Sequence, residues 1–177
     1  NNSISKCEFP TLEKIWQDSQ NSDMTCLYLH TKGVTKSGVS TIEDWTNYLS
    51  YFCIDRWQDR IAELESNDCT GVNLSGNPED LKSSPELWGY GKAPKHYSGN
   101  FWWSKSSHLS KLVNPISWIP DTNFQRWRVM AEMWLCQLED SKYHNAWSSG
   151  VNHYVDSYPE SKYINQVPQQ KRKCAVY

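Results

Sequence analysis

The feature that most constrains the fold is one long amphipathic stretch between Ile42 and Leu64. Large apolar side chains recur there every three to five residues, at Trp45, Leu49, Phe52, Trp57, Ile61 and Leu64. This recurrence is typical of a helix that buries one face, and Ser40 with Glu43 predicts a capping box at its start. Such a helix needs an apolar surface to cover, so the rest of the chain must supply one.

Short apolar runs of strand length alternate with further helical patterns. MTCLYLH (24–30) and DCTGVNL (68–74) predict buried strands, and FWW (101–103) predicts a strand that leads into the helical pattern SSHLSKLV (106–113). Helical periodicity also covers 11–20 and 122–138. Strands alternating with helices predict an α/β layer fold, in which ligands gather at the carboxyl ends of the strands.

A length of 177 residues suits a single domain with a sizeable core. We expect this core to span about residues 10–140. A Pro/Gly/Ser-rich loop interrupts it at 76–95, and the polar, Tyr-rich and aperiodic segment 141–177 is predicted to wrap the surface as a tail.

Composition excludes some classes of function. The net charge of -2 gives no basic field to hold a nucleic-acid backbone, and no apolar run approaches the roughly 20 residues of a transmembrane helix. Ten Trp and ten Tyr stand against four Phe. These rings keep a polar group and suit surfaces that stack on sugars, although filling the core is the alternative for most of them.

The six cysteines, at positions 7, 26, 53, 69, 136 and 174, form no C-x-x-C pair. A structural zinc site is therefore not expected, and single buried thiols are the default interpretation. We expect a cytoplasmic protein on this basis. The secretory lumen is the alternative, since sequons at Asn1 and Asn73 would permit glycosylation there.

The first motif that suggests chemistry is LHTKG (29–33), at the end of the first predicted strand. It places the imidazole of His30, the hydroxyl of Thr31 and the ammonium group of Lys32 next to each other. Lys32 can meet a phosphate as a point charge, and Gly33 lets a ligand approach the main chain closely. A diphosphate is a suitable ligand; an ordinary turn with a solvated lysine is the alternative.

The second motif is HYSGNFWW (96–103). His96, Ser98 and Asn100 offer directional hydrogen bonds, and a Trp face can stack on the C–H face of a sugar ring. Because side chains alternate across a strand, one of Trp102 and Trp103 is expected to be buried in any case.

Five blocks in this order resemble a family of glycosyltransferase-like proteins of bacteria and large viruses: CLYLHTKGV, DWTNYLSYF, DCTGVNL, HYSGNFWWSKSSHL and RVMAEMWL. They are more distantly similar to glycosyltransferases of the rhamnan-synthesis type. The resemblance runs from about Pro10 to Leu138. It implies a GT-A-like, Rossmann-like domain with a mixed sheet flanked by helices, a nucleotide-sugar donor and a glycan or other hydroxyl acceptor.

The resemblance also implies roles for single residues. The donor diphosphate would lie near His30, Thr31, Lys32, Gly33 and Arg126, and the sugar and acceptor would lie near His96, Ser98, Gly99, Asn100 and Trp103. Glu132 or Asp68 would take the proton of the acceptor hydroxyl. A surface ion pair is the alternative for Glu132.

Two departures from the family pattern matter. Many GT-A enzymes hold Mn2+ or Mg2+ with an Asp-x-Asp pair, whereas Asp68 is followed by Thr70 at the partner position, so the use of a divalent cation is left open. The family also has a strand and helix ahead of the TLEKIW segment, and this first unit is predicted to be missing. A non-catalytic carbohydrate-binding domain is the alternative function. A binder of single-stranded nucleic acid is disfavoured by the charge.

Overall fold

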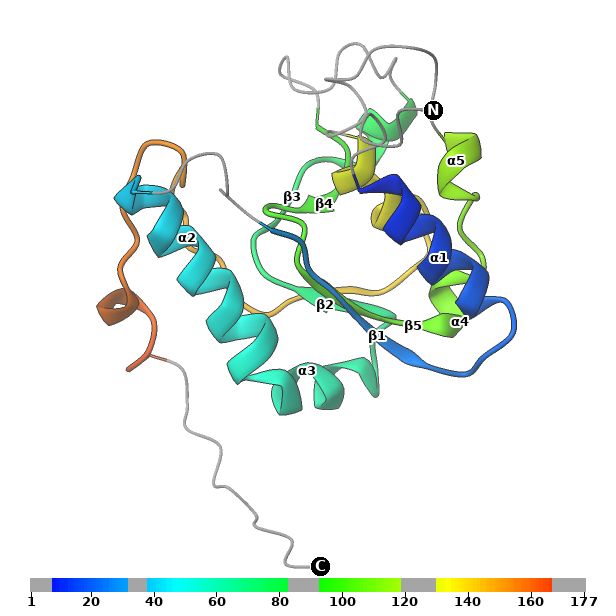
Figure 1. Cartoon of the computed structure of the whole chain (residues 1–177), viewed down its shortest axis with the longest axis horizontal. Helices are drawn as coiled ribbons and strands as arrows, with labels where there is room; N and C mark the ends of the chain where they lie inside the picture. Colours follow the sequence, from blue (N-terminus) through cyan, green and yellow to red (C-terminus); the bar gives the residue numbers. More distant parts are fainter. Residues whose placement is uncertain (1–7, 32–37, 83–92, 119–129, 167–177) are drawn as a thin grey trace, which may run out of the picture.

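The computed structural model describes residues 8–31, 38–82, 93–118 and 130–166 (Figure 1). At its centre is a four-stranded mixed sheet in the order β1-β5-β2-β6. The strands are β1 (Thr25–Tyr28), β5 (Trp102–Lys105), β2 (Cys69–Gly71) and β6 (Tyr143–Asn145). β5 is antiparallel to β1 and β2, whereas β6 is parallel to β2. The parallel strands β1, β2 and β6 therefore end at the sheet edge at which β5 begins.

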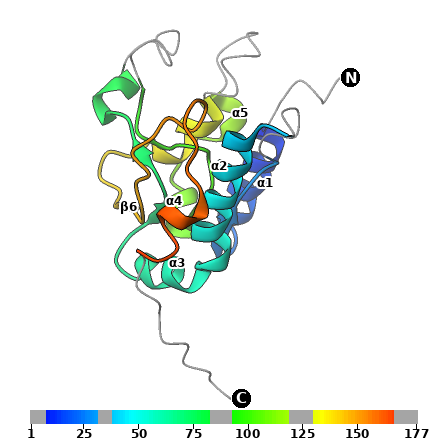
Figure 2. The same cartoon turned by 90° about the vertical axis from the view of Figure 1, so that its left-hand side faces the viewer.

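Helices cover both faces of this sheet (Figures 1 and 2). One face carries α1 (Phe9–Ser19), α4 (Ser106–Leu109), α5 (Pro115–Trp118) and the helical residues 130–133, which continue into η6 (Trp134–Cys136). The other carries α2 (Ser40–Ser50), η3 (Tyr51–Asp55) and α3 (Trp57–Leu64). A mixed sheet flanked by helices was predicted from the sequence, and this part of the prediction is confirmed.

Four smaller elements complete the described chain. β3 (Leu74–Ser75) and β4 (His96–Tyr97) pair as an antiparallel ribbon beyond the carboxyl end of β2. Two short 3-10 helices are η4 (Pro78–Lys82) and η7 (Glu160–Lys162). Residues 83–92 of the predicted loop 76–95 and residues 122–129 of the predicted helix 122–138 lie outside the described residues.

Each face of the sheet has its own apolar core, because side chains alternate along the strands. Trp102 faces the α1 side, where its ring stacks on Tyr28 with centroids 4.9 Å apart. Trp103 faces the opposite side and donates its indole N–H to the Cys53 carbonyl at 2.7 Å. The expected alternation of these two rings is confirmed, and Trp102 is the fully buried one.

The long helix predicted over 42–64 is interrupted by the π-helical turn η3. A π-helical turn holds one residue more than an α-helical turn. It shifts the inward face of α3 by one position, so Arg60 is buried while Trp57 and Ile61 are exposed. The prediction that Trp57 and Ile61 face the core is therefore wrong.

The capping box predicted at the start of this helix is also wrong. Val39 is the residue that precedes the first turn of α2, and no side chain there bonds the free backbone N–H groups. Ser40 instead lies inside the helix as its first residue.

The segment beyond residue 140 differs from the predicted surface tail. Residues 143–145 form β6, which pairs with β2 inside the sheet. Tyr158 and Tyr163 are buried in the core on the α2 side, and Trp147 packs against it. These aromatic residues follow no regular spacing, so the sequence pattern did not indicate their burial.

The described cysteines are consistent with the expected single thiols. Cys53, Cys69 and Cys136 are buried, Cys26 is half-buried, and all four are free. Burial raises the pKa of the Cys53 thiol to about 12, so this side chain behaves as a small apolar group. No helix in the described part of the chain combines the length and apolar character needed to cross a membrane.

Candidate functional site

The two motifs singled out in the sequence meet at the carboxyl end of β1. Tyr28, the last residue of β1, pairs in register with Trp102, the first residue of β5. The residues that follow Tyr28 therefore lie beside the residues that precede Trp102. The ring nitrogen Nε2 of His30 lies 3.2 Å from the carbonyl oxygen of Gly99.

The turn before β5 adopts a backbone conformation that suits few residues. Gly99 and Asn100 have φ values of +98° and +56°, in the left-handed region that Gly and Asn tolerate best. A Cβ atom at Gly99 would lie 2.8 Å from Cδ1 of Leu49 and 3.2 Å from Nε1 of Trp45. Both the φ angle and the close approach of α2 therefore require glycine here.

A carboxylate that the sequence analysis did not single out links these motifs. Oε2 of Glu8 accepts hydrogen bonds from Nδ2 of Asn100 at 2.7 Å and from the hydroxyl of Tyr28 at 3.0 Å. Its Oε1 lies 3.5 Å from Nδ1 of His30. Asn100 is 1% exposed, and its Oδ1 accepts the indole N–H of Trp102 at 2.9 Å. We call Glu8, Tyr28, His30 and Asn100 the Glu8 cluster.

The Glu8 cluster holds the His30 ring between two oxygens and keeps Tyr28 as a hydrogen-bond donor. The two ring nitrogens of His30 face the Gly99 carbonyl and the Glu8 carboxylate. Burial raises the pKa of Tyr28 far above its usual value, and the charges of Glu8 and Glu132 raise it further. The phenol therefore stays protonated and donates to Glu8.

Glu132 lies near this cluster, since its charge acts on the phenol of Tyr28. It is half-buried on the helical residues 130–133. Among the described residues its carboxylate has neither a hydrogen-bond donor nor an ion-pair partner. A half-buried carboxylate that accepts no hydrogen bond from the described residues is available to take a proton from a ligand.

Asp68, the other predicted base, is not brought into this site. It precedes β2 and therefore lies at the opposite edge of the sheet. Its Oδ2 accepts the backbone N–H of Lys142 at 2.9 Å, and its carbonyl accepts that of Lys105 at 3.2 Å. These bonds hold the starts of β2 and β6 and the end of β5 together.

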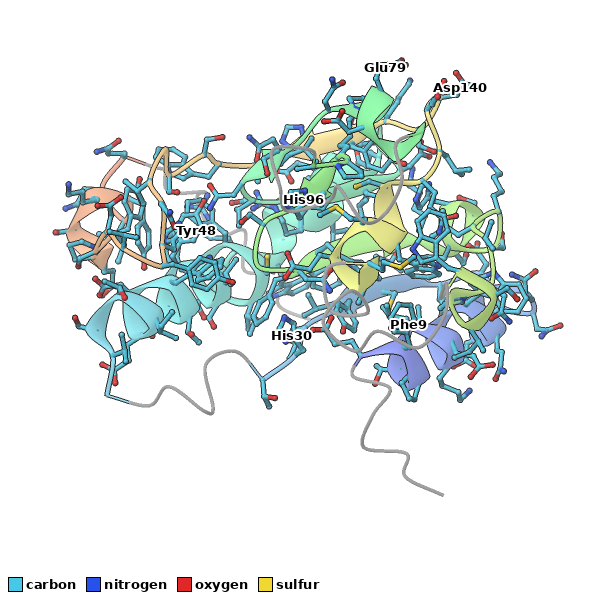
Figure 3. The ribbon with its side chains drawn as sticks, turned by 90° about the horizontal axis from the view of Figure 1, so that it is seen from above. Phe9, His30, Tyr48, Glu79, His96 and Asp140 are labelled. Carbon is cyan, nitrogen blue, oxygen red and sulfur yellow. The ribbon has the colours of Figure 1, made fainter. Side chains whose placement is uncertain are left out.

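Other predicted sugar-binding residues are separated from the cluster. His96 lies on β4, with Nδ1 2.8 Å from the Pro94 carbonyl, and Figure 3 shows it well apart from His30. Trp103 is half-buried on the α2 side of the sheet, where its indole N–H bonds the Cys53 carbonyl. Ser98 faces an open pocket on the other side of the turn. The structure thus brings His30, Gly99 and Asn100 together and leaves the others outside this group.

Four predicted donor-site positions remain. Thr31 is exposed directly after His30. Lys32, Gly33 and Arg126 lie outside the described residues.

Sequence reasoning missed Glu8 and Tyr28. Glu8 precedes the region of resemblance and sits one residue ahead of α1, where an acidic residue is unremarkable. Tyr28 has the appearance of an ordinary strand residue. Only the packing of α1 against β1 and the turn before β5 shows that these side chains share one hydrogen-bond network.

Within the described ranges, no group of three or more His, Cys, Asp or Glu side chains is arranged to hold a metal ion. Comparisons of the chain with protein-family models, curated proteins and solved structures found no match.

Proposed function

We propose that this protein is a glycosyltransferase that moves a sugar from a nucleotide-sugar donor to a hydroxyl group of a glycan or another acceptor. The observation that supports this most is the contact between His30 and Gly99, which joins the LHTKG and SGNFWW motifs at one edge of the sheet. This is the edge at which ligands gather in α/β folds. A GT-A-like fold is part of the proposal.

The reaction needs a base for the acceptor and a positive charge for the leaving group. The acceptor oxygen attacks the anomeric carbon, and its proton passes to Glu132. The bond between that carbon and the diphosphate oxygen breaks, and the nucleoside diphosphate leaves with the electron pair.

In this proposal His30 faces the leaving diphosphate together with Lys32, which follows it by two residues in the sequence. Glu8 holds the ring of His30 from one side and the Gly99 carbonyl holds it from the other. The carboxylate of Glu8 already accepts hydrogen bonds from Tyr28 and Asn100. Glu132 has no such donors among the described residues and is therefore the better candidate for the base.

The proposal is tested by measuring nucleoside diphosphate release from UDP-, GDP- and dTDP-sugars, with and without Mn2+. Changing Glu132→Gln keeps the shape of the side chain and removes the base. We expect a rate lower by about 10²- to 10⁴-fold with an unchanged melting temperature. Glu65→Gln, at an exposed position beyond α3, is the matched control and should keep full activity.

An absence of diphosphate release and of thermal stabilisation across the whole donor panel would count against this function. Full activity in the Glu132→Gln variant would leave the function standing and overturn only the assignment of Glu132 as the base. Binding of glycans without any transfer would favour the alternative of a non-catalytic carbohydrate-binding domain.

A further inference from the structure

An open pocket of about 240 Å³ lies on the other side of the turn that carries Gly99 and Asn100. One wall comes from the β3–β4 ribbon and the turn that follows it. The other wall comes from 148–151, within the segment that was predicted to be a surface tail. The residues that line it are Asn73, Leu74, Ser75, Ser98, Ser148, Ser149, Gly150 and Val151.

Several hydroxyl groups around the pocket are held in place by a side chain behind them. Nδ2 of Asn145 donates to Oγ of Ser148 at 2.6 Å, and Nε2 of His96 lies 3.4 Å from Oγ of Ser75. The hydroxyl of Ser98, by contrast, has no hydrogen-bond partner among the described residues. It is therefore available to a ligand.

The orientation of the Ser149 hydroxyl follows from three successive hydrogen bonds. The backbone N–H of Ser149 can only donate, and it lies 2.8 Å from Oδ1 of Asn73, which fixes the orientation of that amide. Nδ2 of Asn73 therefore donates to Nε2 of His153 at 3.2 Å. This ring nitrogen is an acceptor and carries no proton.

Oγ of Ser149 lies 2.8 Å from the same nitrogen, so the serine proton points at His153. One lone pair of the Ser149 oxygen accepts the backbone N–H of Val151 at 3.4 Å, and the other faces away from the ring. His153 itself is 4% exposed and stacks on Trp45 with centroids 5.1 Å apart. Ser149 is thus a fixed hydrogen-bond acceptor, and Ser98 is an adjustable donor or acceptor.

The chemistry of the lining indicates the class of ligand. No charged side chain is among the lining residues, so neither a phosphate nor a carboxylate would find a counter-ion. Hydroxyl and amide groups alternate with the apolar side chains of Leu74 and Val151. An uncharged sugar ring offers the matching surface, with hydroxyls at its rim and C–H groups on its faces. The volume suits one ring.

We propose that this pocket, the serine pocket, binds one ring of an uncharged sugar, with Ser98 and Ser149 as its hydrogen-bonding contacts. That this sugar is the acceptor rests on the proposed glycosyltransferase function. Only Gly99 separates Ser98, at the pocket, from Asn100, at the Glu8 cluster. A sugar in the pocket therefore lies beside the proposed site of transfer.

The test is a titration of the isotope-labelled protein with the methyl glycosides of glucose, galactose, mannose and rhamnose, followed by amide NMR shifts. We expect at least one of them to shift the amides of Ser98, Ser149, Gly150 and Val151 in a saturable manner. Glucuronic acid should bind more weakly, because its carboxylate finds no cation.

Changing Ser98→Ala should weaken glycoside binding by about two- to tenfold, the effect of one hydrogen bond between uncharged groups. This variant breaks no bond within the described protein, so folding is not at risk. Ser149→Ala should have a similar effect. Ser107→Ala, on the exposed side of α4, is the control and should bind as the native protein does.

The failure of this inference differs from the failure of the proposed function. Diphosphate release without any shift at the serine pocket, or with shifts only elsewhere, would overturn the inference and leave the transferase intact. Shifts at the serine pocket without diphosphate release would support the sugar site and overturn the transferase.

Discussion

Gly99 and Asn100 hold the candidate site together through their backbone conformation as much as through their side chains. Their left-handed φ angles turn the Gly99 carbonyl toward His30 and the Asn100 amide toward Glu8. The Asn100 side chain then links Glu8 to the indole of Trp102. Gly99 and Asn100 are thus required by geometry whether or not a ligand binds there.

Changing Gly99→Ala tests this requirement. Gly150→Ala is the matched control, because Gly150 also has a positive φ of +71° but a Cβ there would meet nothing within 4 Å. The control should lose about 1 kcal/mol of unfolding free energy from backbone strain. Gly99→Ala should lose about 1–3 kcal/mol more from its clash with Leu49. Equal losses in urea unfolding would show that the close approach of α2 is unimportant.

His108 makes the stability depend on pH. Burial lowers its pKa from the ordinary value, while Nε2 is 2.9 Å from the Leu135 carbonyl and Nδ1 is 3.0 Å from Oγ of Ser141. The unfolded chain therefore binds a proton more readily than the folded protein. This contribution to stability is fully present above the unfolded value of about 6.5 and is lost as the pH falls toward the lower folded value.

We expect the unfolding free energy to fall as the pH drops below about 6.5, and His108→Gln to reduce that slope. The glutamine amide can still donate to Leu135 but takes up no proton in this range. The measurement is urea unfolding at several pH values. An unchanged slope in the variant would place the pH dependence elsewhere.

At the scale of secondary structure, the π-helical turn η3 decides which residues of α3 face the core. The backbone N–H of Arg56 bonds the Tyr51 carbonyl at 3.0 Å, five residues earlier. Two carbonyl groups of this turn accept hydrogen bonds from side chains. The guanidinium group of Arg60 donates to the Phe52 carbonyl at 3.3 Å, and the indole N–H of Trp103 donates to the Cys53 carbonyl at 2.7 Å. Trp103 was expected to contact a sugar, whereas its indole N–H makes a hydrogen bond within the protein.

Changing Trp103→Phe separates these two roles. Phenylalanine keeps an aromatic face but leaves the Cys53 carbonyl without its indole donor. The unfolding free energy should fall by about 1–3 kcal/mol, whereas a sugar-stacking role would lower only ligand binding. Trp57→Phe is the control, because Trp57 is 49% exposed and its change should cost less than about 0.5 kcal/mol.

For the whole molecule, the C-terminal part of the described chain is structural. It supplies the fourth strand of the sheet and covers the core on the α2 side. The ring of Tyr163 is 1% exposed and stacks on Tyr158 with centroids 5.8 Å apart. The same segment provides one wall of the serine pocket.

Changing Tyr163→Ala should therefore cost about 3–5 kcal/mol of unfolding free energy, as the loss of a buried aromatic ring does. Tyr154→Ala is the matched control from the same segment, since Tyr154 is 61% exposed, and should cost less than about 1 kcal/mol. Both values are read from chemical denaturation. If both variants lose only a little unfolding free energy, the segment is a surface tail, as the sequence predicted.

Periodicity by itself determined the layered α/β class, the helices at α1 and α2 and the strands β1, β2 and β5. Local patterns suffice for these elements because a helix or strand that buries one face has apolar residues at regular spacing. The motifs around His30 and Asn100 were also visible, since polar groups that end an apolar strand stand out in the sequence.

Only the tertiary structure decided which of these residues meet. The antiparallel pairing of β1 with β5 places His30 against Gly99, and it sends Asp68 to the opposite edge. The same packing adds Glu8 from the residue before α1 and sets Glu132 beside Tyr28. Contacts between residues distant in the chain depend on strand order and register, which no local spacing encodes.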